Sequence, residues 1–145
     1  MDGLITDTKR KLVAKFKMKD LGMMHYFLGI EVWQNTDRIF LVQGKYEINI
    51  LKRFGMMDYK AMATSMASNL KLLSDASSKP VDDTMYRQIM IGSLMYLINT
   101  RPDIFFCVNT LSQFLIDPRN VHLITVKHIL RYLRGTSDEQ VRCKG

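Results

Sequence analysis

The spacing of apolar positions predicts a helix and then a β-hairpin in the first third of the chain. Between residues 6 and 17, Leu12 and Phe16 share one helical face, while lysine and arginine cover most of the remainder. Residues 25–33 and 38–43 are rich in aromatic and β-branched side chains and are separated by the polar letters QNTD. Two such runs joined by a short polar stretch are typical of an antiparallel hairpin.

The first strand of this hairpin, residues 25–33, is expected to present two different faces, because side chains alternate along a strand. One face then carries Tyr26, Leu28, Ile30 and Val32, and the other carries Phe27, Gly29, Glu31 and Trp33. Gly29 in the middle of this strand is expected to weaken it unless another group must come close to the backbone there. Glu31 is the one acid of this apolar segment, and we expect it to face solvent or a basic neighbour.

The rest of the chain is helical in pattern apart from one long polar stretch. That stretch, residues 57–80, shows no period and is rich in Ser, Ala and Asn, which predicts a linker of unusual length for one compact domain. Helices are expected at residues 45–54, at 83–99, from Pro102 onward, and from Pro118 to Gly135. The predicted fold class is α+β, a β-hairpin with flanking helices followed by a three-helix bundle. The expected divisions are residues 1–56 with the hairpin, 57–82 as linker, 83–135 as the helical part and 136–145 as a tail.

Composition is compatible with one domain of ordinary size or with a piece of a larger one. The chain has 145 residues and is 47% hydrophobic. No apolar run approaches the ~20 residues that span a bilayer, and the N-terminus lacks the continuous apolar segment of a secretory signal. We therefore expect an intracellular protein, cytoplasmic or nuclear, that makes no contact with a membrane.

The charge balance favours a polyanionic partner. The chain carries 21 Lys and Arg against 14 Asp and Glu, for a formal net charge of +7. Lysine and arginine neutralise phosphates and release counterions, so nucleic acid is a natural partner. A well-solvated basic surface explains the same balance equally well. Cys107 lies in an apolar run and is predicted to be a buried thiol, and the cysteines and histidines show no metal-ligand spacing.

Two adjacent carboxylates, Asp82 and Asp83, raise the question of a metal site. Paired carboxylates suit Mg²⁺ bound to substrate phosphates. The flanking sequence favours a different role, because polar letters SDASSKP precede the pair and the helical run TMYRQIMIGSLMYL follows it. Acids just ahead of a helix cap its free amides and suit the positive end of its dipole. We interpret this pair as a helix start and expect no metal site in the chain.

Four segments carry a resemblance to a known family. They are MKDLGMMHYFLGIEV, RIFLVQGKYEINILKRFGM, MYRQIMIGSLMYLINTRPDI and HILRYLRGT. In this order, and over nearly the whole chain, they resemble the reverse transcriptase, an RNA-directed DNA polymerase, of copia-type retrotransposon Pol polyproteins. The sequence departs from that family where AMATSM, residues 61–66, replaces a proline-rich Thr-Pro-Met, so a stiff turn of the linker is lost.

The resemblance implies the end of a polymerase palm followed by a thumb-like bundle. The catalytic Tyr-Val-Asp-Asp of the family would lie before Met1, and its ribonuclease H domain would begin just past Gly145. Polymerisation by this chain alone is therefore not expected. Magnesium is implied for the full-length polymerase and no cofactor for this part. The implied partners are an RNA/DNA template-primer duplex and the missing fingers, palm and ribonuclease H portions.

The hairpin resembles the primer grip, which holds the 3′ end of the primer. A two-stranded ribbon offers backbone amides, Gly29 permits close approach, and Trp33 can pack against a sugar or base. Phe27 belongs to the same expected contact. The alternative is a hairpin whose Phe27 and Trp33 simply fill the core.

The last predicted helix carries two stripes. An apolar stripe predicted to face the core consists of Val126, Ile129, Leu130 and Leu133. A basic stripe consists of Lys127, Arg131 and Arg134, and we expect it to contact duplex phosphates, with Lys52 and Arg53 as weaker candidates. The alternative is a solvated basic face. For the whole chain, the alternatives are a stand-alone basic α+β module that binds proteins and a retroelement relic without function.

Overall fold

A computed structural model describes residues 2–66 and 77–142. The predicted α+β class is confirmed, with a three-stranded antiparallel sheet in the order β1-β2-β3. The elements are α1 (Asp2–Lys15), β1 (Tyr26–Phe27), β2 (Ile30–Gln34), β3 (Ile39–Val42), α2 (Gly44–Arg53), α3 (Asp83–Ile89), the π-helical turn η2 (Met90–Leu94), α4 (Met95–Leu97), the 3-10 turn η3 (Pro102–Ile104), α5 (Phe105–Ser112) and α6 (Asn120–Arg142). Parts of the predicted linker and tail, residues 67–76 and 143–145, lie outside the described residues.

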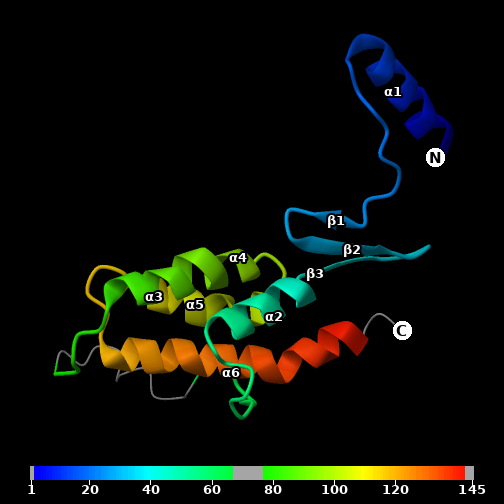
Figure 1. Cartoon of the computed structure of the whole chain (residues 1–145). Coiled ribbons are helices and arrows are strands. Elements are labelled where there is room, and N and C mark those ends of the chain that lie inside the picture. Colours follow the sequence, from blue (N-terminus) through cyan, green and yellow to red (C-terminus); the bar gives the residue numbers. More distant parts are fainter. Residues whose placement is uncertain (1, 67–76, 143–145) are drawn as a thin grey trace.

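The elements form a helical layer, a small sheet beside it and a separate N-terminal helix. In Figure 1, α6 runs along the length of the helical layer, with α3, α4 and α5 on one side of it. Helix α2 follows the last strand of the sheet and packs against α6. Helix α1 stands away from the other elements, and its apolar side chains, Leu4 at 74% exposure among them, face solvent.

The predicted strand at residues 25–33 is broken in the middle, and the predicted division of its two faces is wrong as well, because Tyr26 lies opposite Glu31 and Phe27 lies opposite Ile30. Leu28 and Gly29 have positive φ values of 49° and 83° and form a two-residue turn between β1 and β2. A turn with two positive φ angles matches the right-handed twist of the flanking strands, and glycine adopts it at little cost. Because apolar residues flank this turn on both sides, the sequence pattern there resembles one continuous strand. The second hairpin has the predicted place with its turn one residue later, since Gln34 is the last residue of β2 and pairs with Ile39 across residues 35–38.

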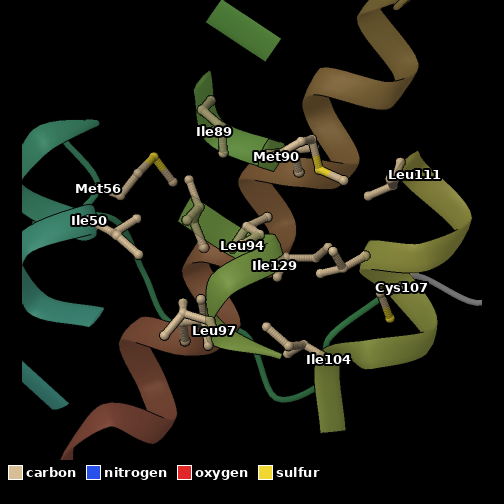
Figure 2. Close-up of a cluster of buried hydrophobic side chains, with 14 of the residues drawn as sticks. Ile50, Met56, Ile89, Met90, Leu94, Leu97, Ile104, Cys107, Leu111 and Ile129 are labelled. Carbon is tan, nitrogen blue, oxygen red and sulfur yellow. The ribbon is translucent and has the colours of Figure 1, made fainter. Parts of the chain in front are cut away.

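The helical core forms where the apolar stripes of several helices meet (Figure 2). All four residues of the apolar stripe predicted on α6 are fully buried, and Cys107 is buried as predicted. Burying one aliphatic side chain of this size contributes about 1.5–3 kcal/mol, so this cluster dominates the stability of the layer. Its labelled members in Figure 2 are Ile50, Met56, Ile89, Met90, Leu94, Leu97, Ile104, Cys107, Leu111 and Ile129.

Two predicted helix ends require correction. The last helix does not stop at Gly135 but continues to Arg142. Leu133 and Ser137 are both buried one turn apart on either side of the glycine, so packing outweighs the ~1 kcal/mol that glycine costs inside a helix. The helix expected at residues 83–99 ends at Leu97 and contains the π-helical turn η2.

Candidate nucleic-acid interface

The hairpin presents its aromatic side chains to solvent. Phe27 on β1 is 54% exposed and Trp33 on β2 is 46% exposed. The alternative in which both rings fill the core is therefore wrong. Gly29 lies at the tip of the β1–β2 turn, and a Cβ added there would lie 3.3 Å from the hydroxyl oxygen of Tyr96. The group next to Gly29 within the chain is therefore a tyrosine of α4, and the approach of a primer strand to Gly29 stays a prediction.

A pocket of about 390 Å³ opens beside the hairpin, next to the N-terminal end of α2. It is lined by His25, Tyr26, Glu31, Val32, Trp33 and Lys45. Glu31 is only 5% exposed, so of its two expected surroundings solvent is wrong, and it lies instead beside a basic residue, Lys45. Its Oε1 accepts a hydrogen bond from the backbone N–H of Lys45 at 3.4 Å. A carboxylate at this position interacts favourably with the unpaired amides and the positive dipole of the first helical turn.

The basic stripe of α6 is partly engaged within the chain. Lys127 is exposed, whereas Arg131 and Arg134 are half-buried. Arg131 Nε donates to the carbonyl oxygen of Lys60 at 2.7 Å, and Arg134 Nε donates to that of Met57 at 3.0 Å. Two of the three cations predicted to bind phosphate therefore also bind the protein backbone.

These bonds belong to a longer contact between α6 and residues 57–66, which we call the strap. His128 Nε2 lies 2.8 Å from the carbonyl oxygen of Thr64, and the N–H of Met62 donates to the carbonyl of Arg131 at 3.2 Å. A Cβ added at Gly135 would lie 3.0 Å from the Cβ of Ala61, so the glycine makes room for the strap. The first part of the predicted linker therefore runs along α6.

Lys52 and Arg53 lie in the last turn of α2 and are exposed. They precede the strap, whereas the hairpin lies at the other end of α2, beyond Gln43. At about 1.5 Å of rise per residue, ten residues of helix separate the two groups by roughly 15 Å. Lys52 and Arg53 therefore lie at the end of α2 that leads into the strap, and Phe27 and Trp33 lie beyond its other end.

A buried charged cluster links α2, η3 and α6, and nothing in the sequence pattern indicated it. The Arg101 side chain is 5% exposed and that of Glu47 is fully buried. The guanidinium donates to Glu47 Oε1 at 2.8 Å, to the two carboxylate oxygens of Asp103 at 2.9 and 2.8 Å, and to Thr136 Oγ1 at 2.7 Å. The Tyr132 hydroxyl donates to Asp103 Oδ2 at 2.8 Å. We call these five residues the Arg101 cluster.

The pKa shifts in this cluster follow from burial and from the hydrogen bonds. Burial raises the pKa of Glu47, and the charge of Arg101 offsets only part of this effect. The hydrogen bond from Arg101 lowers the pKa of Asp103, whose carboxyl group is nearer to solvent. Burial also opposes the charge on Arg101, but the hydrogen bonds and charges of both acids keep its pKa above the ordinary value. The cluster therefore holds an arginine that stays protonated between two unequal acids.

The Asp82–Asp83 pair serves the start of α3. Asp82 Oδ1 accepts from the N–H of Thr84 at 2.9 Å, which confirms the capping interpretation. Asp83 forms an ion pair with Arg87 at 3.1 Å, one helical turn later. One oxygen of each carboxylate thus takes part in holding the start of α3. Among residues 2–66 and 77–142 there is also no group of three or more His, Cys, Asp and Glu side chains that could hold a metal ion.

Comparison with known proteins decides the family. Residues 2–68 match the family described as reverse transcriptase (RNA-dependent DNA polymerase). Over 97% of its length the chain is 42% identical to the retrovirus-related Pol polyprotein from transposon RE1 of Arabidopsis thaliana. Over 94% of its length it is 39% identical to the corresponding polyprotein from transposon TNT 1-94 of Nicotiana tabacum. The chain belongs to the copia-type reverse transcriptases.

This copia-type reverse transcriptase segment is short beside its relatives. It spans 10% of the RE1 polyprotein and 11% of the TNT 1-94 polyprotein. An uncharacterized mitochondrial protein of Arabidopsis thaliana is 40% identical over 87% of the chain, which spans 52% of that protein. No solved structure matches the segment significantly. In the part of the chain that the structure describes, no helix is long and apolar enough to cross a membrane.

Proposed function

We propose that this reverse transcriptase segment binds the template-primer duplex and does not itself carry the catalytic carboxylates. The observation that carries the proposal is the hairpin, which exposes Phe27 and Trp33 to solvent. Exposed aromatic rings stack on bases or sugars. Magnesium would act in the full-length polymerase, held by carboxylates outside this segment.

The basic stripe of α6 supplies the second proposed contact, to phosphates. Phosphate contacts position a duplex without reading its sequence, which is what a polymerase requires. Lys127 is exposed and free to swing toward a strand. A guanidinium carries five N–H donors, so the strap bonds made by Nε of Arg131 and Arg134 use only part of each group. On this proposal α3 to α6 act as a thumb-like unit with Lys52 and Arg53 as additional contacts.

The salt dependence of binding tests this proposal. We expect fluorescence anisotropy with a labelled RNA/DNA duplex to show affinity that falls steeply with salt, because bound counterions are released. Lys127→Ala should flatten the slope of log affinity against log salt by about 0.9 units, the contribution of one phosphate. Lys15→Ala on α1 is the matched control and should leave the slope unchanged. A slope that responds equally to both substitutions, or to neither, would reject a specific role for α6.

Primer extension tests the second half of the proposal. The purified segment with primed template, deoxynucleotides and magnesium should produce no extended product, because phosphoryl transfer needs metal-bridging carboxylates. Extension above the level of a buffer control would show that catalytic residues lie within this segment.

Helix α1 favours a second candidate function, the binding of a protein partner. Leu4, Ile5 and Val13 on this helix, and Phe16 just after its end, are all more than half exposed, and an apolar surface of this kind marks an interaction site. The other portions of the polyprotein are the partners that the family membership suggests. Binding through this apolar surface should persist at high salt, whereas duplex binding should not. The same titration therefore separates the two functions.

A further inference from the structure

The hairpin tip rests on an aromatic side chain of the helical layer. Leu28 and Gly29 form the turn, and the backbone of Gly29 is the part that approaches Tyr96. At the Gly29 φ of 83° a side chain is strained, and its Cβ would also press on the Tyr96 hydroxyl at 3.3 Å. The Leu28 side chain, in contrast, is 72% exposed. The turn therefore meets Tyr96 through its backbone.

A second tyrosine holds the first one. Tyr46 lies in the first turn of α2, and its ring meets that of Tyr96 edge to face, with centroids 5.1 Å apart and an interplanar angle of 86°. The Tyr46 hydroxyl donates to the carbonyl oxygen of Gly92 at 3.0 Å. Aromatic pairs prefer this edge-to-face arrangement, which is directional as well as apolar. The two rings thus connect the turn, α2 and the π-helical turn η2.

The Gly92 carbonyl that accepts this hydrogen bond belongs to an irregular turn of the helix. Gly92 lies within η2, where the backbone departs from the α-helical bonding pattern between α3 and α4. Single π-helical turns inside α-helices occur frequently at functional sites. Gly92 is exposed and has no side chain, so the Tyr46 hydroxyl reaches its carbonyl without obstruction.

We propose that Tyr46 and Tyr96 are positioning residues that set the place of the Leu28–Gly29 turn relative to the helices, and thereby the place of a strand end bound at the hairpin. The proposal rests on the template-primer function above. Glu31 and the β3–α2 connection anchor the base of the sheet to α2, but the tip of β1–β2 meets the helices at Tyr96. Loss of this pair should therefore free the tip while the core below remains packed.

Nuclear magnetic resonance tests the contact directly and without nucleic acid. In the wild type we expect cross-relaxation between the Gly29 α-protons and the Tyr96 ring, together with ring-current shifts at Gly29. Tyr96→Leu should abolish both signals, and Tyr96→Phe should retain them because the ring remains. Phe106→Leu, at a 62%-exposed aromatic position on α5, is the control and should change neither. Absence of the Gly29–Tyr96 contact in the wild type would overturn the proposal.

Binding to two duplexes tests the consequence for function. One duplex has a recessed 3′ end and the other is continuous and of equal length. We expect Tyr96→Leu to reduce the preference for the recessed end by about two- to tenfold, the range expected for one aromatic pair. Tyr96→Phe should restore the preference, Tyr46→Phe should reduce it partly, and melting temperatures should stay close to the wild-type value.

The possible results separate this proposal from the proposed function. Equal loss of affinity for both duplexes, or loss in step with the melting temperature, would show that the tyrosines are only structural and would overturn the proposal. If the wild type binds neither duplex, template-primer binding fails and the role in placing a strand end fails with it. The Gly29–Tyr96 signals would still report whether the tyrosine pair places the turn.

Discussion

Replacing Arg101 with leucine should be among the most damaging single changes in this chain. The substitution leaves Glu47, which is fully buried, without the cation that compensates its charge. Removing one partner of a buried ion pair costs about 3–5 kcal/mol, against a total stability of about 5–15 kcal/mol for a domain. Asp103 adds less to the cost, because its side chain is 38% exposed and can be hydrated. We therefore expect Arg101→Leu to remove at least about a fifth of the free energy of unfolding.

The compensating double variant gives this prediction its sharpest test. Arg101→Leu with Glu47→Leu removes both charges, and an apolar pair in place of a buried ion pair is often neutral in stability. The double variant should therefore be more stable than Arg101→Leu alone. The stability of Arg101→Lys should fall between those of the wild type and Arg101→Leu. An ammonium group keeps the positive charge but lacks the planar set of N–H donors that binds three acceptors at once.

Urea unfolding followed by far-UV circular dichroism measures all four proteins. The difference in unfolding free energy between wild type and Arg101→Leu should also become smaller at mildly acidic pH. Burial already raises the pKa of Glu47, so the unpaired carboxylate takes up a proton and loses its charge. An Arg101→Leu protein within ~1 kcal/mol of wild type, or a double variant no better than the single one, would refute the reasoning.

Three further predictions concern Asp103, Asp82 and Gly135. The hydrogen bond from Arg101 lowers the pKa of Asp103 in the folded protein. The stability that Asp103 contributes is therefore complete above its ordinary pKa of 3.8 and is lost as the pH falls through the lower folded pKa. Asp103→Asn should accordingly reduce the fall of the urea midpoint with decreasing pH in this acidic range. Asp82→Ala removes the cap of α3 and should lower the unfolding free energy by about 1 kcal/mol, with no response to magnesium in thermal melts of either protein. Gly135→Val should destabilise, despite the better helix propensity of valine, because its Cβ would meet Ala61 at 3.0 Å; equal or higher melting temperature would show that the strap yields easily.

The local pattern of the sequence carried most of the secondary structure. The apolar stripe on α6, the QNTD hairpin turn and the capping role of Asp82 were all predictable, because each depends on residues within about two helical turns of one another. The family membership was also visible, since the matching segments are long and retain their order. Such features require no knowledge of what packs against them.

The tertiary structure alone decided which polar groups meet. Arg101 and Glu47 lie 54 residues apart and Arg134 and Met57 lie 77 apart, so no periodicity connects them. The strap binds α6 through backbone carbonyls, which every residue possesses, and therefore leaves no mark in side-chain pattern. The Leu28–Gly29 turn was missed because the local pattern was misleading, since its flanking residues suit a continuous strand. Only the pairing of Phe27 with Ile30 shows that the chain reverses there. Long-range pairing thus settled the surroundings of each candidate site residue, whereas local pattern settled the element on which it lies.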